Sequence, residues 1–493
     1  MKKVGKYVAI TLLMLLGLFC VGILYLFFIP NSSLFNITYI NNNEVIKSKK
    51  YSTDAVSEIN LNSRSYELNV MSTDDDKISI EVSSHSFGFV HKKNEKVKIS
   101  SSLSNNILTF NVAEPYGLTA NSSSSINLFL PTSKIFDLNL KNKKSETSIS
   151  DKNLSLNNFS YTTISGNLNL NKVTITGKMK LNLNESECFI DSSVETNFNN
   201  IDLKLTSGKF IATKSQFGDI TILKNSRGII NVDQCNTVRE NISDAGGQIN
   251  VNKISHINVK ASDTIISLGK VENGAIIDLV GSGKTTIGTL KGVSSISTNS
   301  GKIKINNCLS SATLHTDDGN ITVKKAMKTI STKTNYGEIN IAFSDDADHY
   351  SESDTDKSRT LFAEIKNGKL TATGVEHVGS SNFDSNQGII VTGNGRVNLT
   401  MNDVCGENLI KGKNGNVKIV INHESIYKLT TNPNKKTQGN VRVNLMQISQ
   451  YKGYTNKGKK DTYVNCTETT YGTNQLIAST TTGDLTILDT KVN

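Results

Sequence analysis

A glycine that recurs at a constant interval is the feature that most restricts how this chain can fold. Gly283, Gly301, Gly319 and Gly337 follow one another at steps of 18 residues. After each of the last three, Ile or Val alternates with polar residues, as in the run Ile-Thr-Val after Gly319 and Asn320. Such alternation is typical of a β-strand with one buried face, and a constant step marks a structural repeat. We expect glycine at the corner before each strand because it adopts positive φ without a steric penalty.

Looser copies of the same unit extend the pattern over most of the chain. They predict further corner glycines on both sides of the regular series: Gly166, Gly218, Gly247, Gly395, Gly415, Gly439 and Gly483. One such strand cannot bury its apolar face alone, but equivalent strands stacked on each other build a continuous core. The pattern therefore predicts an all-β chain whose main part is a parallel β-helix, or β-solenoid. A β-sandwich is the alternative, although its hairpins would not require a constant step.

The N-terminus carries a segment of membrane-spanning length. Residues from Tyr7 to Ile29 carry no charge and are mostly apolar, and Lys2, Lys3 and Lys6 precede them. As a helix this run would span about 34 Å, enough to cross the hydrocarbon core of a bilayer. No small residues suited to signal-peptide cleavage follow it. We therefore expect an uncleaved anchor from Tyr7 to Ile29 in a single-pass protein of the cell membrane, with the lipid bilayer as a partner.

The anchor sets the expected order of the remaining regions. The lysines place residues 1–6 in the cytoplasm and the bulk of the chain outside the cell, with residues 30–55 as a polar stalk. Residues 56–140 alternate like strands but without a repeat. We expect them to form a small β-sheet that caps the membrane-proximal end of the solenoid, because an uncovered end would expose a sheet edge. Residues 141–493 are the expected solenoid, with about 15–17 coils of about 20 residues each.

An acidic interval, residues 344–358, interrupts the repeat. Its acidic side chains lie between Asp345 and Asp356, and we expect a loop that leaves one coil and is exposed to solvent. The spacing of its carboxylates does not match the calcium-binding loop of an EF-hand. A solvated loop is therefore the preferred interpretation, and calcium binding stays open.

The charge of the chain limits which kinds of partner it can be expected to bind. The formal net charge is +10, from 54 basic and 44 acidic residues, which could favour anionic envelope polymers or lipid head groups. Because no basic run is longer than a few residues, we expect this charge to lie on solvated faces. No stripe of Arg and Lys with interleaved aromatic residues occurs, so nucleic acid is not an expected partner.

The cysteines are widely spaced and lack a C-x-x-C motif, which predicts isolated thiols, with one disulfide between neighbouring coils as an alternative.

The motifs that would carry chemistry are incomplete. The segment 281–286 reads Gly-Ser-Gly-Lys-Thr-Thr, but a phosphate-binding loop requires glycine where Asp278 stands and a helix after the lysine. Because Gly283 belongs to the 18-residue series, we expect a strand here and no nucleotide site. The histidines have no metal-ligand spacing, and the acidic residues near strands are scattered. We therefore expect no catalytic, cofactor-binding or metal-binding residue, and no enzyme activity.

The order of these segments resembles a known family. A membrane-proximal β region, a strand that ends in Leu130-Pro131, and serial Ser/Thr-x-x-Gly-x-Ile-x-Ile units are similar to the bacterial putative-adhesin β-solenoid domain family. The resemblance covers roughly residues 56–490. It implies an envelope-associated β-solenoid and supplies no catalytic residues.

Three functions follow as hypotheses. The preferred one is an extracellular adhesin or scaffold that contacts envelope or host glycans or proteins, without catalysis, through regularly spaced Asn, Ser, Thr and Lys. The second is an envelope-stress or membrane-complex accessory protein, which would co-purify with membrane proteins. The third is a glycan-processing enzyme of the β-helix type, which would require acidic residues from different coils to converge in one groove.

Overall fold

The computed structural model describes most of the chain. The described residues are 11–21, 38–90, 97–113, 117–121, 124–191, 197–344, 359–379, 388–422, 424–431, 441–445, 460–464 and 474–490. The corner predicted at Gly439 and the acidic side chains from Asp345 to Asp356 lie outside these ranges.

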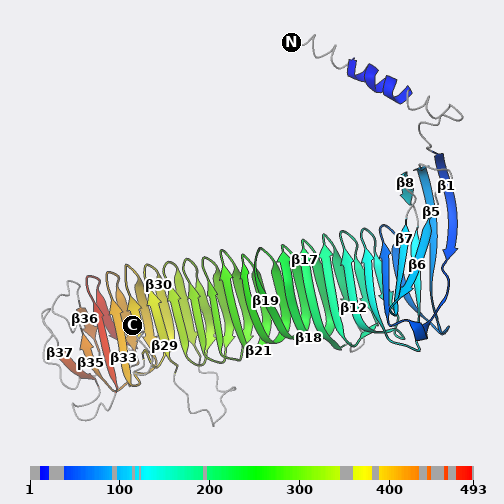
Figure 1. Cartoon of the computed structure of the whole chain (residues 1–493). Helices are drawn as coiled ribbons and strands as arrows, with labels where there is room; N and C mark the ends of the chain where they lie inside the picture. Colours follow the sequence, from blue (N-terminus) through cyan, green and yellow to red (C-terminus); the bar gives the residue numbers. More distant parts are fainter. Residues whose placement is uncertain are drawn as a thin grey trace.

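The described chain is almost entirely β, and its strands pair in parallel into a long rod (Figure 1). This confirms the all-β prediction and agrees with a solenoid. Most coils contribute one strand, or one part of a long strand, to each of two stacks. The strands that follow the corner glycines form what we call the glycine stack. In spatial order it contains β9 (Ser125–Pro131), β4 (Glu67–Thr73), β11 (Thr147–Ser150), β13 (Leu168–Asn171), β16 (Glu187–Asp191), the first parts of β18 (Lys209–Ser226), β19 (Ile229–Ala245), β20 (Gln248–Ser262) and β21 (Ile265–Val280), then β22 (Lys284–Leu290), β24 (Lys302–Cys308), β26 (Ile321–Ala326), β28 (Glu338–Phe343), β30 (Lys369–Val375), β32 (Arg396–Met401), β34 (Val417–Ile421), β39 (Leu485–Asp489) and β36 (Val441–Asn444).

The remaining parallel strands form the opposite stack. In spatial order it contains β7 (Ile107–Ala113), β3 (Glu58–Ser63), β10 (Phe136–Asn142), β12 (Ser155–Thr163) with the short β14 (Thr174–Ile175), β15 (Lys178–Asn184), β17 (Asn197–Thr206), the second parts of β18 to β21, then β23 (Ser294–Thr298), β25 (Ala312–Thr316), β27 (Ile330–Thr334), β29 (Leu361–Ile365), β31 (Ile389–Val391), β33 (Glu407–Gly412), β38 (Gln475–Thr480) and β35 (Tyr427–Thr431). Alternate residues of both stacks point inward and pack into one continuous hydrophobic core.

The strand register explains the constant step in the sequence. Ile303 lies opposite Ile321, and Ile321 lies opposite Ile339, so a step of 18 residues returns the chain to the same position one coil further on. Each isoleucine thereby stacks on its equivalents, and each is at most 1% exposed. The pattern that predicted a strand is therefore also the pattern that aligns neighbouring coils.

The N-terminal end combines parallel coils with antiparallel cover strands. We expected residues 56–140 to form a separate capping sheet, but β3, β4, β7 and β9 pair in parallel and continue the two stacks. The cover consists of β5 (Lys77–Val90), antiparallel to β9, and β6 (Lys98–Ser104), antiparallel to β7. Because β7 and β9 lie outside β3 and β4, the first coil of the chain is second in space.

The expected stalk, residues 30–55, is folded wherever the structure describes it. β1 (Thr38–Lys47) is antiparallel to β5 along its whole length, and β2 (Tyr51–Ser52) also pairs with β5. A 3-10 turn follows at Thr53–Ala55, and β8 (Gly117–Asn121) lies on the other edge of β5. The polar composition that suggested a stalk is instead that of a strand exposed to solvent. Residues 30–37 lie outside the described ranges.

At the C-terminal end, as at the N-terminal end, the terminal coil of the sequence is not the terminal coil in space; we call this arrangement interlocked. β38 pairs with both β33 and β35, and β39 pairs with both β34 and β36. The last coil of the sequence is therefore inserted between two earlier coils. β37 (Lys460–Val464) then covers β35 as an antiparallel strand.

The N-terminal segment includes an α-helix over residues 11–21. This helix lies inside the anchor predicted from Tyr7 to Ile29, whose remaining residues are outside the described ranges. Among the residues that the structure describes, no helix has both the length and the apolar character that a membrane span needs.

Candidate binding groove

Close packing between coils explains the repeat glycines better than the positive φ that we expected. A Cβ added to Gly301 would lie 1.5 Å from the carbonyl oxygen of Gly283, and one added to Gly319 would lie 1.7 Å from that of Gly301. Each corner therefore lies directly against the backbone of the preceding corner. Gly337 is the only predicted corner glycine with positive φ, 142°, in the described part of the chain. Positive φ was therefore the wrong reason to expect glycine at Gly301 and Gly319.

The other predicted glycines divide into packed corners and one misassignment. Gly415 and Gly483 continue the column, since an added Cβ would lie 1.6 Å from the oxygen of Gly395 and 2.0 Å from that of Gly415. At Gly166 and Gly247 the added atom would meet Ser145 and Asn225. Gly218 is not a corner, because it lies inside β18 in the part that pairs with β17.

Gly368 is a corner glycine that was not predicted from the sequence. An added Cβ at Gly368 would lie 2.0 Å from the oxygen of Gly337, so these two glycines belong to neighbouring coils. The acidic interval between them breaks the regular step, which hid this member of the series.

A buried threonine three residues before the glycine completes several corners. The Oγ1 of Thr316 donates to the carbonyl oxygens of Asn299 and Gly301, at 3.3 and 3.4 Å. Thr298 donates in the same way to Gly283, at 3.4 Å. These carbonyls lie at a buried corner, where an unpaired polar group would be costly. The Thr-x-x-Gly pattern therefore has a structural origin and is not evidence of a binding motif.

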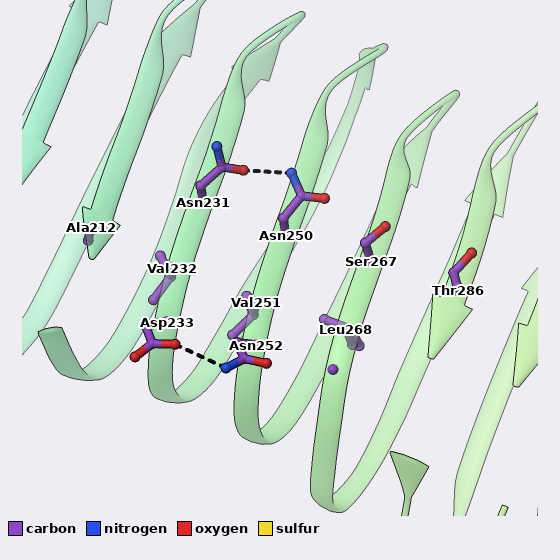
Figure 2. A pocket seen from close by; sticks show the side chains of 11 residues that line it. Ala212, Asn231, Val232, Asp233, Asn250, Val251, Asn252, Ser267, Leu268 and Thr286 are labelled. Carbon is purple, nitrogen blue, oxygen red and sulfur yellow. Dashed lines mark hydrogen bonds between the residues drawn. The ribbon is translucent and has the colours of Figure 1, made fainter. Parts of the chain in front are cut away.

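A groove of about 650 Å³ runs across β18 to β22 on the glycine stack. Figure 2 shows its lining residues, which are Ala212, Asn231, Val232, Asp233, Asn250, Val251, Asn252, Ser267, Leu268, Gly269 and Thr286. The strand register places Asn231, Asn250, Ser267 and Thr286 at equivalent positions of successive coils. We call the series that these residues belong to the central row. Its members face outward because they alternate with buried residues.

Hydrogen bonds between neighbouring coils fix the polar edges of the groove. The Nδ2 of Asn250 donates to Oδ1 of Asn231 at 2.6 Å, and the Nδ2 of Asn252 donates to Oδ1 of Asp233 at 3.1 Å (Figure 2). These bonds hold the amide side chains in place before any ligand arrives. Preordered side chains lose less conformational entropy on binding than mobile ones.

The floor of the groove is apolar. Val232, Val251 and Leu268 are 5%, 2% and 3% exposed, so they offer only a thin apolar surface. Gly269 leaves space beside them, and a Cβ there would lie 2.3 Å from the carbonyl oxygen of Asn252. The groove thus joins a narrow apolar floor to amide, hydroxyl and carboxylate groups, a combination that suits a polar ligand with some apolar surface.

The segment 281–286 lies at the corner between β21 and β22. The backbone N–H and the hydroxyl of Ser282 both donate to Oδ1 of Asp263, at 2.7 and 2.9 Å. These hydrogen bonds hold the pKa of the Asp263 carboxyl below its usual value, the backbone N–H being the larger cause. Thr285 is fully buried. The N–H group of Ser282 that a phosphate would need is therefore already bonded to a carboxylate, and a strand follows instead of a helix.

Within the described ranges no three residues among His, Cys, Asp and Glu lie close enough together to hold a metal ion. Cys188, Cys235 and Cys308 are free thiols packed in the core. Burial raises the pKa of both Cys235 and Cys308 to about 12, so these thiols are poor nucleophiles. Asp233 is the only carboxylate among the residues that line the groove.

Sequence reasoning did not find the groove. The signal was present as a small polar residue three positions after the corner glycine, such as Asn250 after Gly247. In a single repeat this residue looks like any exposed polar position of a strand. Only the register of several coils shows that such residues form a continuous row.

Comparisons with known proteins place the chain in a family. A family model described as Toastrack DUF4097 matches residues 56–373. A crystal structure of a putative cell adhesion protein from Clostridium sporogenes is 14% identical, with a TM-score of 0.17, and the match covers 46% of this chain and 100% of that one. A putative adhesin from Parabacteroides distasonis is 12% identical, with a TM-score of 0.21, and the match covers 72% and 97% of the two chains. No curated protein matches the sequence. Because the family model spans more than half of its length, the chain belongs to the Toastrack DUF4097 family.

Proposed function

We propose that this protein is a membrane-anchored surface rod that acts as an adhesin, and that the groove on the glycine stack is its binding site. One observation carries the proposal. The hydrogen-bonded amides of Asn231 and Asn250 form a preordered polar edge beside an apolar floor. The proposed activity is binding alone, so a bound glycan would be recovered unchanged.

The central row gives the rod its capacity to hold a long ligand. Beyond the groove it continues along the glycine stack through residues in register: Lys304, Thr322, Asn340, Thr371, Asn398, Lys418 and Thr486. Neighbouring members are separated by one strand spacing, about 4.8 Å. A glycan that lies along the rod would meet similar hydroxyl and amide groups at each step, and many weak contacts can add up to useful avidity.

The N-terminal helix supports attachment to a bilayer. Its apolar side chains, such as Leu13, Leu18 and Phe19, are 69%, 69% and 67% exposed. A helix that is apolar on all sides is typical of a membrane environment. We propose that Tyr7 to Ile29 cross the membrane once, with residues 1–6 in the cytoplasm and the rod outside the cell.

Binding of purified full-length protein, in non-ionic detergent, to a panel of immobilised envelope and host glycans tests the proposal. Asn250→Ala removes both the groove amide and its bond to Asn231, so affinity for a bound glycan should fall about tenfold. Asn182→Ala is the matched control, because Asn182 is an exposed asparagine on the opposite stack, away from the groove and the central row. If no glycan binds, or if the two variants bind equally well, the groove is not the binding site.

The exposed apolar helix also favours a second candidate, a membrane-complex accessory protein that contacts its partners through the anchor. Replacement of Tyr7 to Ile29 by an unrelated transmembrane segment distinguishes the two functions. An adhesin should keep its affinity for the glycan after this exchange. An accessory protein should instead lose the membrane proteins that co-purify with it.

A further inference from the structure

The groove ends beside three lysines that have no carboxylate partner. We call Lys284, Lys302 and Lys304 the lysine cluster. Lys284 and Lys302 lie directly opposite each other on β22 and β24, and Lys304 follows Thr286 in the central row. All three side chains are exposed. The cluster therefore continues the groove along the rod and lies on the same outward face.

Two nearby lysines do have an acidic partner. Lys270 and Lys291 both form ion pairs with Glu272, at 2.6 and 3.1 Å. No carboxylate among the described residues lies within ion-pair distance of Lys284, Lys302 or Lys304. Like charges opposite each other on adjacent strands are destabilising. The free protein therefore contains a local repulsion that a bound anion would relieve.

We propose that the groove and the lysine cluster together bind an anionic polysaccharide that lies along the rod. This inference rests on the proposed adhesin function and defines its ligand class. Acidic groups of the polymer would pair with the lysine cluster, and sugar hydroxyls would bond to the groove. The bond between Asn250 and Asn231 leaves the Nδ2 of Asn231 as a donor and the Oδ1 of Asn250 as an acceptor (Figure 2). A polymer with both hydroxyl and acidic groups complements both parts.

Two forms of one polymer separate the contribution of charge from that of shape. Polygalacturonate carries a carboxylate on each sugar, and its fully methyl-esterified form has the same backbone without the charge. We expect the full-length protein in non-ionic detergent to bind polygalacturonate at least about tenfold more tightly, because several weak ion pairs add to the glycan contacts. This preference should shrink as salt is raised, since the pairs are exposed.

Two triple variants with equal charge test the location of the site. Replacement of Lys284, Lys302 and Lys304 by Gln should weaken polygalacturonate binding about tenfold and binding of the esterified polymer much less, because Gln keeps a polar group at each position and removes only the charge. Replacement of Lys180, Lys204 and Lys224 by Gln is the control. Lys204 and Lys224 also lie opposite each other, but on the opposite stack. The thermal midpoint of the first variant should not fall, because the change removes a repulsion.

Each outcome has a definite meaning. Equal affinity for the two polymers, no binding of polygalacturonate, or an equal loss in both triple variants would overturn the proposal. If the esterified polymer still binds and Asn250→Ala weakens it, the adhesin function stands and only the charge inference fails. If short polyphosphate competes as well as polygalacturonate does, the cluster is a general anion site, and the inference of a glycan ligand fails.

Discussion

At the scale of single residues, the fold depends on the absence of side chains at the corners. Gly283, Gly301 and Gly319 form a column in which each glycine touches the carbonyl of the one before. The spacing of these glycines could be predicted from the sequence. The contact between them could not, because positive φ and close approach both select glycine. Coordinates of neighbouring coils are needed to separate the two causes.

Gly319→Ala tests this account. The added Cβ would lie 1.7 Å from a backbone oxygen, so the backbone of two coils must shift, and we expect a loss of about 3 kcal/mol in the free energy of unfolding. Asp318→Ala is the control at the adjacent exposed position and should change stability by no more than about 0.5 kcal/mol. Urea denaturation followed by circular dichroism measures both. A loss at Gly319 no larger than that at Asp318 would refute the packing explanation.

Asp263 makes a corner sensitive to acid. The bonds from Ser282 hold the pKa of the Asp263 carboxyl below its usual value, so they stabilise the fold at pH values above the unfolded pKa, near 4. This contribution is lost as the pH falls through the lower, folded-state pKa. Asp263 has a φ of 47°, a conformation that Asn tolerates well.

Asp263→Asn should therefore be less stable than the wild type at pH 6 and closer to it at pH 3. Urea midpoints at the two pH values measure this difference, with Asp318→Asn as the control. A stability gap that stays constant between pH 6 and pH 3 would mean that the Asp263 carboxylate contributes nothing through its charge.

At the scale of elements, the two ends of the rod have the same design. At each end the terminal coil in space is not the terminal coil in sequence, because β7 and β9 lie outside β3 and β4, and β35 and β36 lie outside β38 and β39. Antiparallel strands then cover outer edges at both ends. An edge strand left uncovered would be a template for aggregation.

Removal of residues 474–493 tests the inserted coil. β35 and β36 would lose β38 and β39, the strands through which they join the parallel stacks. We expect amide hydrogen exchange in β35 and β36 to become at least about a hundredfold faster, while β19 stays protected, because coils contact only their neighbours. Removal of residues 490–493 alone, beyond β39, is the control and should change neither region. Unchanged protection of β35 after the longer truncation would show that the coil is dispensable.

Strands were easier to predict than their partners. The alternation in segments such as Ile107–Ala113 identifies a strand directly, but nothing in the segment shows that it pairs with β3, from which β4, β5 and β6 separate it along the chain. The prediction of a stalk over residues 30–55 was wrong for a related reason. The backbone hydrogen bonds of β1 come from its pairing with β5, and the polar sequence of β1 gives no sign of that pairing.

At the scale of the whole molecule, the repeat brings residues that are separated along the chain next to each other on one surface. Lys284 and Lys302 are far apart in sequence and formed no basic run, so the sequence analysis assigned their charge to dispersed solvated faces. The coil places them side by side on adjacent strands, next to the groove. Searches for runs of like residues miss such surfaces, whereas comparison of residues at the coil step finds them.

The inserted coil near the C-terminus has a mechanical consequence. A rod that is tethered at one end and loaded at the other transmits force through its backbone to the strands at its tip. β39 is bonded along both edges, to β34 and to β36, so a pull on the chain end cannot peel it away one bond at a time from a free edge. Several backbone bonds on both sides must be sheared together. The two interlocked ends would therefore act as stops against unravelling.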